Sequence, residues 1–318
     1  MIFLVVMVAL FQACIPSASL TGESMPTPVM PQGASAPSAV GSSRRPSITP
    51  LDLTRTQPLP TIANRATPTP SRSTSTPTIA PCLLVGGQVE VAELSTELLS
   101  DPLVYRIYLP PCYLSQPERL YPVLYLVHGQ TYTDTQWQRL GVPGAIDRLV
   151  AAREIAPFIV VMPRDRLWRE PTSDNFGMAI QQALIPWVDG HYRTNPERAF
   201  RAIGGLSRGA AWAIHLGFSH PELFSAVGIH SGFVFYTDVG SLPQWLSGMP
   251  EGLAPRIYID AADNDRPEIT ESSTWLEEVL TQNDIPHEWH MFTGEHAEAY
   301  WQAHVEDYLR WYSLDWAK

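Results

Sequence analysis

The 318-residue chain has few cysteines, few basic residues and no apolar run long enough to cross a membrane. Its longest apolar run, residues 2–11, would rise about 15 Å as a helix, which is roughly half of a bilayer core. The chain has 21 Lys and Arg against 32 Asp and Glu, a net charge of −11. Because a surface of this sign repels phosphate backbones, we expect no binding to nucleic acid. The lack of long apolar runs excludes a polytopic membrane protein.

Residues 16–81 contain no Trp, Tyr or Phe, whereas they hold 13 of the 30 prolines and 22 Ser or Thr. Such a segment cannot bury enough apolar surface to offset its ordering entropy, so we predict that it is disordered. Residues 82–318 contain all 10 Trp and all 12 Tyr and are long enough for one substantial core. We predict an export signal over residues 1–14, a tether over residues 15–81 and one folded domain beyond them.

The apolar run at the N-terminus is typical of a secretory signal. It ends in Gln12-Ala13-Cys14, which resembles the lipobox of bacterial lipoproteins, whose cysteine is lipidated and becomes the new N-terminus. We therefore expect an extracytoplasmic protein that is either secreted or held by a lipid on Cys14 at the outer face of the bacterial membrane. The alternative to lipidation is an ordinary cleaved signal peptide. The lipid would be the only contact with the membrane.

Cys82 and Cys112 are the cysteines of the predicted domain. In an exported protein we expect them to form a disulfide that closes a loop of about 30 residues. The alternative is two unpaired thiols. Two cysteines do not supply the four ligands of a structural zinc, so we expect no metal site.

Beyond Cys82, short β-rich runs alternate with helical stretches, and several runs are apolar throughout. Continuously apolar strands indicate a parallel sheet covered by helices on both faces, so we predict a doubly wound α/β fold. The expected strands are residues 104–109, 123–127, 158–162, 199–206, 226–230, 257–260 and 288–292. The expected helices are residues 143–153, 175–192, 208–218, 270–282 and 297–311.

The strongest motif is Gly205-Leu206-Ser207-Arg208-Gly209, which lies between an expected strand and an expected helix. This is the nucleophile elbow, G-x-S-x-G, in the strand–turn–helix context that it requires. The turn exposes the serine hydroxyl at the carboxyl end of the sheet and directs the Arg208 amide to the same place. We predict that Ser207 is the nucleophile of an acyl-transfer reaction. The alternative is a structural strand–helix turn.

A serine hydroxyl needs a base to accept its proton, and in this class of fold the acid and then the histidine follow on later loops. His296 is the best candidate for the base, because it lies between the last expected strand and the last expected helix. The loop after residue 260 offers Asp265, which we prefer as the acid, and Asp263, which remains the alternative. The acid would fix the imidazole tautomer and stabilise the imidazolium.

The tetrahedral intermediate of such a reaction also needs hydrogen-bond donors for its oxyanion. The buried strand at residues 123–127 ends in His128-Gly129-Gln130. Gly129 would let the backbone approach the elbow, so we predict the backbone amides of Gln130 and Arg208 as the two donors. The alternative is that the His-Gly pair only ends a strand.

Substrate contacts are harder to assign. Four tryptophans follow strand ends or lie near His296, where they could stack on sugar or aromatic acyl groups. We select Trp137, Trp168 and Trp301 and keep Trp245 as a further candidate, with core packing as the alternative for each. The side chain of Arg208 is a candidate for binding an anionic substrate. Candidates in loops at the same edge of the sheet, with solvated surface as the alternative, are Asp134, Arg164, Asp165 and Arg166.

The order of these motifs resembles the esterase D family. The resemblance covers nearly all of residues 103–312, and it includes Tyr-Pro-Val-Leu-Tyr-Leu-Val-His-Gly, Gly-Leu-Ser-Arg-Gly, an Asn-Asp loop and Gly-x-His before an aromatic helix. The family includes feruloyl and acetylxylan esterases, enterochelin esterases, S-formylglutathione hydrolases and the antigen 85 mycolyltransferases. The resemblance implies an α/β-hydrolase with a minimal lid, and it places the triad on Ser207, His296 and Asp265.

We therefore predict a serine esterase that acts on small-molecule or glycan-linked carboxylic esters, such as acetyl, feruloyl or siderophore esters, without a metal or organic cofactor. The closest alternative is an acyltransferase of the antigen 85 type, in which a sugar hydroxyl replaces water. An alternative of another class is a catalytically inactive module that binds glycan or peptide. The sequence does not indicate an oligomeric state.

Overall fold

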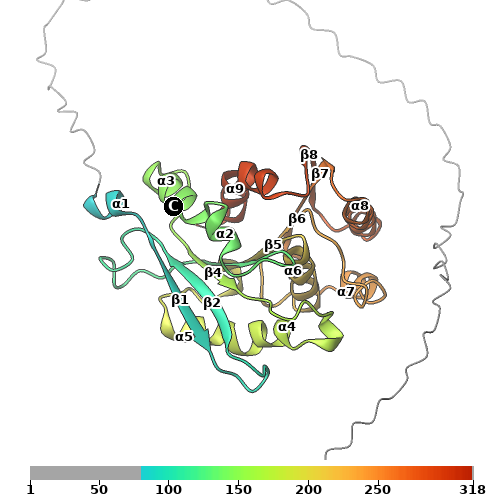
Figure 1. Cartoon of the computed structure of the whole chain (residues 1–318), viewed down its shortest axis with the longest axis horizontal. Helices are drawn as coiled ribbons and strands as arrows, with labels where there is room; N and C mark the ends of the chain where they lie inside the picture. Colours follow the sequence, from blue (N-terminus) through green and yellow to red (C-terminus); the bar gives the residue numbers. More distant parts are fainter. Residues whose placement is uncertain (1–79, 317–318) are drawn as a thin grey trace, which may run out of the picture. The chain divides into compact units, whose positions relative to one another are not determined.

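The computed structural model describes residues 80–316, which form an eight-stranded sheet with helices on both faces (Figure 1). The strand order is β1-β2-β4-β3-β5-β6-β7-β8, and only the β1–β2 and β2–β4 pairs are antiparallel. The strands are β1 (Gln88–Leu94), β2 (Leu103–Leu109), β3 (Val123–Val127), β4 (Ile159–Pro163), β5 (Arg201–Leu206), β6 (Ala226–His230), β7 (Arg256–Asn264) and β8 (Glu288–Glu295). The predicted α/β class is confirmed.

Helices cover both faces of the sheet because its central strands are apolar throughout. Every residue of β3, β4, β5 and β6 is buried, so each strand needs cover on both sides. One core contains side chains of α4 (Phe176–Ala179), α5 (Ile185–His191), α6 (Arg208–Ser219), α7 (Leu242–Ser247) and α8 (Pro267–Gln282). The opposite core contains side chains of α2 (Gln136–Arg139), α3 (Val142–Ala151) and α9 (Glu298–Tyr312).

The structure differs from the sequence prediction in several elements. The expected helix at 175–192 consists of α4, a π-helical turn (Ile180–Leu184) and α5. Pro186, near the start of α5, has no N–H for an α-helical bond, which accounts for the irregularity before it. Strand β1 was not predicted because it is an edge strand whose side chains are mostly exposed, with only Leu94 buried. The short helices α2 and α7 were also not predicted, nor was α1 (Pro81–Val85).

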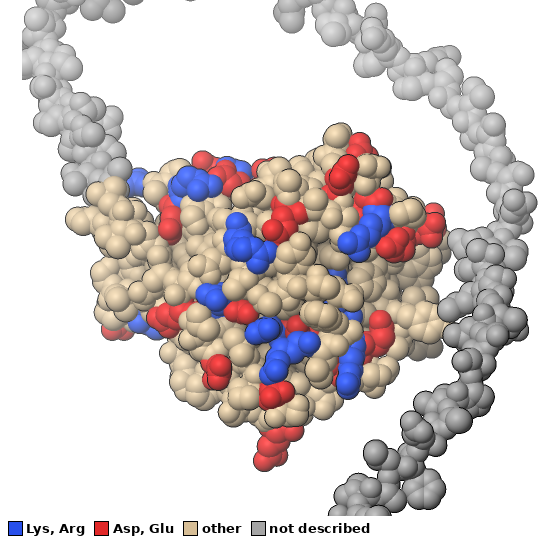
Figure 2. Space-filling view, viewed as in Figure 1, with Lys and Arg blue, Asp and Glu red and all other residues tan. Residues whose placement is uncertain are grey.

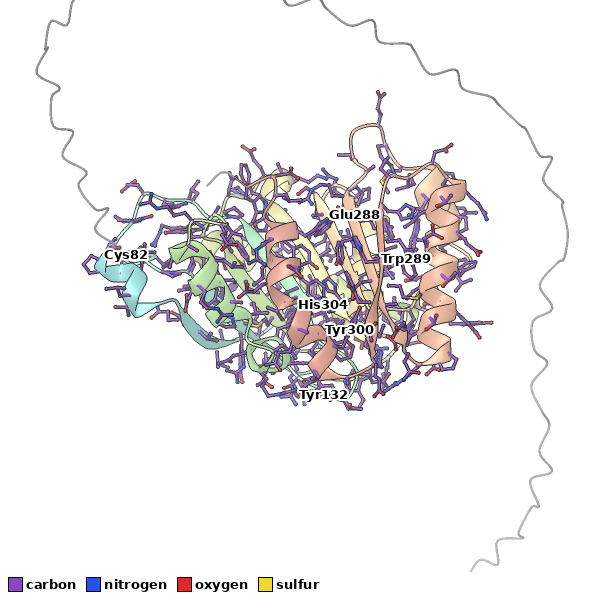
Figure 3. All side chains as sticks on the ribbon, turned by 90° about the horizontal axis from the view of Figure 1, so that it is seen from above. Cys82, Tyr132, Glu288, Trp289, Tyr300 and His304 are labelled. Atoms are coloured by element: carbon purple, nitrogen blue, oxygen red, sulfur yellow. A yellow bond between two sulfur atoms is a disulfide. The ribbon has the colours of Figure 1, made fainter. Side chains whose placement is uncertain are left out.

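Cys82 and Cys112 form the expected disulfide, which ties α1 to the turn after β2. Figure 3 shows Cys82 on α1 at one side of the domain. The bond spans 30 residues, a loop for which the chain-entropy model gives about 3 to 4 kcal/mol of stabilisation.

The predicted export signal, Cys14 and residues 15–79 of the predicted tether lie outside the described residues. Among residues 80–316, no helix combines the length and the apolar character needed to cross a bilayer.

Candidate active site

Ser207 occupies the turn between β5 and α6 in a strained conformation, with φ 53° and ψ −120°. A Cβ at Gly205 would lie 2.2 Å from the Gly209 carbonyl carbon, and one at Gly209 would lie 2.0 Å from the Val127 carbonyl oxygen. Both positions therefore require glycine. The Ser207 amide donates to the His230 carbonyl at 2.9 Å, so the turn is fixed to the neighbouring strand.

The structure brings together the three residues predicted as a triad. His296 Nε2 lies 2.9 Å from Ser207 Oγ, and His296 Nδ1 lies 2.7 Å from Asp265 Oδ1. Because a carboxylate only accepts, Nδ1 carries the proton and leaves Nε2 free to accept from the serine hydroxyl. The arrangement can move a proton from Ser207 to His296.

Asp265, and not Asp263, is the carboxylate beside the imidazole. Its side chain is fully buried. Burial alone would raise the pKa of Asp265, but the hydrogen bond and charge attraction of His296 outweigh burial and hold this pKa below its ordinary value. Asp263 is exposed and accepts from the Gly294 amide at 3.0 Å, which fixes the end of β8 to β7.

The two predicted oxyanion donors flank the serine. Gln130 lines the same cavity as Ser207, and a Cβ at Gly129 would lie 2.9 Å from Leu206 Cδ1, so glycine allows this close approach. Within residues 80–316, neither the Gln130 nor the Arg208 backbone N–H donates a hydrogen bond. Both amides are therefore available to an oxyanion.

His128 orients the peptide that carries the Gln130 amide. Its Nε2 accepts from the Asp165 amide at 3.0 Å, so Nδ1 bears the hydrogen and donates to the Gly129 carbonyl at 2.7 Å. Burial lowers the pKa of His128, which favours this neutral form. In a trans peptide the C=O and N–H point in opposite directions, so holding the Gly129 carbonyl also fixes the direction of the Gln130 N–H.

The carboxylate of Asp165 holds the side chain of Arg208, the residue that follows the serine. Asp165 Oδ2 accepts from Arg208 Nε at 2.8 Å and from Trp212 Nε1 at 2.9 Å, and all three side chains are buried. Asp165 therefore contacts two residues beside the predicted donors: its backbone amide donates to His128, and its carboxylate accepts from the Arg208 side chain. The idea that the Arg208 side chain binds an anionic substrate is wrong, because its guanidinium lies in the interior and does not line the cavity. Asp165 is not solvated surface either.

A cavity of about 580 Å³ opens beside Ser207. Its apolar wall includes Tyr132, Phe233 and Trp301, and its polar wall includes Arg266 and Glu268. We did not predict Tyr132, Phe233, Arg266 or Glu268 as lining residues. Their position directly after the ends of β3, β6 and β7 is the sequence signal that could have identified them.

The three selected tryptophans do not share this cavity. Trp301 lines it and meets the His296 ring edge to face, with centroids 4.9 Å apart. Trp137 was predicted wrongly as a substrate contact, because it is 2% exposed and donates to the Val127 carbonyl at 3.0 Å in the core. Trp168 is 40% exposed but does not line the cavity. Trp245 packs on His215 at α7.

A second, fully buried His–Asp pair lies beneath the triad. His230 Nδ1 is 2.6 Å from Asp260 Oδ1, and Asp260 Oδ2 accepts from Tyr300 at 2.7 Å and Tyr308 at 3.0 Å. Figure 3 shows Tyr300 on α9, next to the strand that carries Glu288 and Trp289. The cluster connects β6 and β7 to the helix that carries Trp301, so it supports the cavity wall. Neither His230 nor Asp260 is exposed to solvent.

The mostly parallel sheet, its helices on both faces and the serine at the strand–helix turn define an α/β-hydrolase fold. Residues 96–312 match the family model described as "Putative esterase", and the chain belongs to this esterase family. The predicted family resemblance is confirmed.

The chain also resembles individual proteins, each over part of its length. It is 28% identical over 193 residues to an endo-1,4-beta-xylanase/feruloyl esterase of Xylanibacter ruminicola, covering 57% of this chain and 26% of that protein. It is 32% identical over 122 residues to an esterase of Mycobacterium tuberculosis, covering 36% and 26%. The chain thus spans about a quarter of the length of these two relatives. A solved ferulic acid esterase superposes with a TM-score of 0.65 at 23% identity, covering 73% of this chain and 99% of that one.

Proposed function

We propose that the protein is a serine esterase in which Ser207 is the nucleophile, His296 the general base and Asp265 the residue that orients the base. The observation that carries this proposal is the hydrogen-bond chain from Ser207 Oγ to His296 Nε2 and from His296 Nδ1 to Asp265. Membership of the esterase family supports the same reaction.

In the first half of the reaction, Ser207 Oγ attacks the ester carbonyl carbon while His296 Nε2 takes the hydroxyl proton. The carbonyl oxygen becomes an oxyanion, which accepts hydrogen bonds from the backbone amides of Gln130 and Arg208. Asp265 stabilises the imidazolium. The intermediate then collapses, the alcohol leaves with the proton from His296, and the acyl group stays on Ser207.

In the second half, a water molecule attacks the acyl carbon and His296 again takes the proton. The same amides stabilise the second oxyanion. Collapse returns the proton to Ser207 Oγ and releases the carboxylic acid. No metal or organic cofactor takes part in either half.

We propose that the substrate is a carboxylic ester of a carbohydrate or a related polyol. The cavity beside Ser207 has room for an aromatic acyl group, and its wall of Tyr132, Phe233 and Trp301 suits a flat ring. Two similar proteins are named as feruloyl or ferulic acid esterases, which makes feruloyl esters the first to test beside acetyl and siderophore esters.

We further propose that the enzyme acts outside the cytoplasm, with Cys14 as a lipid-anchor residue. The disulfide between Cys82 and Cys112 supports this location, because structural disulfides persist in oxidising compartments. Globomycin blocks removal of lipoprotein signals. A bacterium that expresses the full chain should therefore accumulate the uncleaved precursor when it is treated with globomycin. A Cys14→Ser variant that still reaches the membrane fraction would contradict lipid anchoring.

A fluorophosphonate probe tests the activity. We expect wild-type protein to be labelled at Ser207 and Ser207→Ala to be unlabelled, because the probe needs an activated serine. Absence of labelling in folded wild type would favour a binding module. Hydrolysis of methyl ferulate in the presence and absence of a sugar acceptor separates the esterase from an acyltransferase, since only the latter forms a new sugar ester.

A further inference from the structure

Gln136, the first residue of α2, has a polar side chain that is fully buried and takes no part in the mechanism described so far. Its Oε1 accepts from the Gly129 amide at 2.8 Å, and its Nε2 donates to Glu298 Oε1 at 3.2 Å. Because a backbone N–H only donates and a carboxylate only accepts, these two partners fix which way the Gln136 amide points. Only a side chain that both accepts and donates makes both bonds.

The bond to Gly129 acts on the oxyanion loop, residues 128–130. Gly129 precedes Gln130, whose amide is a predicted oxyanion donor. The Gly129 carbonyl accepts from His128 Nδ1 at 2.7 Å, while the Gly129 amide donates to Gln136. The peptide planes before and after Gly129 are therefore both anchored. Because glycine has wide conformational freedom, the direction of the next N–H group depends on these two anchors.

The bond to Glu298 connects the oxyanion loop to the segment that carries His296. Glu298 is the first residue of α9 and follows His296 by two positions. Its carboxylate also pairs with Arg139, the last residue of α2. Figure 2 shows basic and acidic side chains next to one another over α2 and α9. The two bonds of Gln136 thus bridge the loop of one oxyanion donor and the start of the helix that follows the predicted base.

The backbone around Gln136 is itself fixed, so the side chain can act as a support. The Gln136 amide donates to the Thr133 carbonyl at 2.9 Å, and the Leu140 amide donates to the Gln136 carbonyl at 2.9 Å. The next residue, Trp137, is buried and donates to the Val127 carbonyl at 3.0 Å, at the end of β3. A rigid turn therefore presents the Gln136 side chain to the two segments that it bridges.

We propose that Gln136 is a positioning residue, which sets the place of the Gln130 amide relative to the imidazole of His296. Gln136 does not line the catalytic cavity, so it acts through its two partners and not on substrate. The inference rests on the proposed function, because this spacing matters for rate only if an oxyanion forms at Ser207. A purely structural side chain would affect folding without affecting the binding of an oxyanion.

Gln136→Met removes both hydrogen bonds and keeps a side chain of similar length. We expect kcat for 4-nitrophenyl acetate to fall by about tenfold, less than the loss of a whole oxyanion donor, with KM changed by less than about twofold. Inhibition by a trifluoromethyl ketone, whose hemiketal on Ser207 carries an oxyanion, should weaken by about the same factor as kcat/KM. Wild-type kcat or unchanged inhibition in folded Gln136→Met would overturn the proposal.

Glu298→Ala tests the bridge at a partly exposed side chain, so it does not depend on a substitution in the core. It removes the acceptor of Gln136 Nε2 but leaves the bond to the oxyanion loop. We expect kcat to fall by about threefold to fivefold, the order of one weak hydrogen bond, with little change in KM. Glu306→Ala is the matched control, because Glu306 is a similarly exposed residue of α9 that pairs with Arg148 and Arg310. Equal kcat in the two variants would overturn the bridge.

Arg139→Met separates the bridge from the neighbouring ion pair. Arg139 is largely exposed, and without it Glu298 can still accept from Gln136. We expect kcat within about twofold of wild type, because exposed ion pairs contribute little. A loss as large as that of Glu298→Ala would assign the effect to the ion pair and would also overturn the bridge.

Hydrogen exchange tests the anchoring of the loop without any catalysis. In ¹⁵N-glycine-labelled protein, the Gly129 amide should exchange more slowly in wild type than in Gln136→Met, because only wild type pairs it. Slow exchange in a wild type that does not hydrolyse 4-nitrophenyl acetate would contradict the proposed function and leave the anchor standing. Hydrolysis by wild type, with equal exchange of this amide in both proteins, would contradict the positioning role of Gln136 alone.

Discussion

The carboxylate of Asp165 accepts a hydrogen bond from Arg208 Nε at 2.8 Å inside the protein, directly beside the nucleophilic elbow. The backbone amide of the same aspartate donates to His128, which in turn holds the Gly129 carbonyl. One buried residue therefore contacts both the Arg208 side chain and the histidine that holds the Gly129 carbonyl. In the proposed mechanism, Asp165 never touches substrate, but it sets the geometry of the oxyanion site.

Asp165→Asn should lower kcat by about tenfold to a hundredfold, less than the loss of a whole oxyanion donor. The substitution removes the charge that holds the Arg208 side chain beside the elbow but keeps the backbone amide that donates to His128, so only the Arg208 amide becomes less well directed. KM for a soluble ester should change much less than kcat, since the oxyanion forms only in the transition state. Steady-state kinetics on 4-nitrophenyl acetate give both constants.

Asp238→Asn is the control for this prediction. Asp238 is equally buried and contacts α6, but it does so through His215, away from the serine. If this variant lost as much kcat as Asp165→Asn, the effect would be one of stability and the positioning role would be wrong.

Asp265→Asn should reduce kcat by about four orders of magnitude, because an amide favours the wrong tautomer of His296. Asp263→Asn should leave kcat within a few-fold of wild type, because the Asp263 carboxylate accepts from the Gly294 amide and is not hydrogen-bonded to His296. Kinetics on the same ester distinguish the two aspartates. The reverse ranking would show that Asp263 is the catalytic acid.

The neutral His128 makes stability depend on pH. Because burial lowers its pKa in the folded state, the unfolded state binds a proton more readily, and stability falls as pH drops below the ordinary histidine pKa of about 6.5. His128→Gln should flatten the slope of the unfolding free energy between pH 7.5 and 5.5, by at most about 1.4 kcal/mol per pH unit. Urea unfolding at several pH values measures the slope. An unchanged slope would mean that His128 is not held neutral.

Asp265 also makes stability depend on pH, but over a lower pH range than His128. Its charged form is an anion, whereas that of His128 is a cation. Its pKa is lowered in the folded state, so its stabilising contribution is present above the unfolded pKa of about 3.9 and is lost as pH falls through the folded value. The acid limb of the stability curve should be shallower in Asp265→Asn than in wild type. Measuring the free energy of unfolding below pH 4.5 in both proteins gives this slope. Equal slopes in Asp265→Asn and wild type would contradict the assignment.

Reduction of the disulfide should destabilise the domain by about 3 kcal/mol and leave the triad intact, since Cys82 and Cys112 lie away from the residues that line the catalytic cavity. The double variant Cys82→Ser/Cys112→Ser should therefore unfold at lower urea concentration with unchanged kcat at 25 °C. A loss of kcat in the folded double variant would argue against this separation.

The sequence alone was sufficient to predict those features of the site that local chain geometry determines. The elbow around Ser207 needs glycines at fixed offsets between a strand and a helix, so its position follows from the chain alone. The place of His296 after the last parallel strand follows from the order of elements in the fold. The expected strand end at residue 260 and the short loop after it left two aspartates as candidates for the triad acid, Asp263 and Asp265.

Side-chain directions could not be predicted, because contacts distant in sequence decide them. Arg208 turns inward because Asp165, 43 residues earlier, neutralises it there. Trp137 follows a strand end, as a pocket residue would, but its indole N–H is used by the Val127 carbonyl. Strand β1 lacks the apolar pattern of a buried strand, because it pairs with β2 at the edge of the sheet.

The most direct test of the account is to trap the acyl-enzyme. Wild-type protein mixed with excess 4-nitrophenyl acetate and quenched in acid within milliseconds should gain the mass of one acetyl group, and peptide mapping should place it on Ser207. The adduct should disappear with time in wild type and should not form in Ser207→Ala. An acetyl group on another residue, or hydrolysis by Ser207→Ala at the wild-type rate, would contradict the proposed catalytic role of this serine.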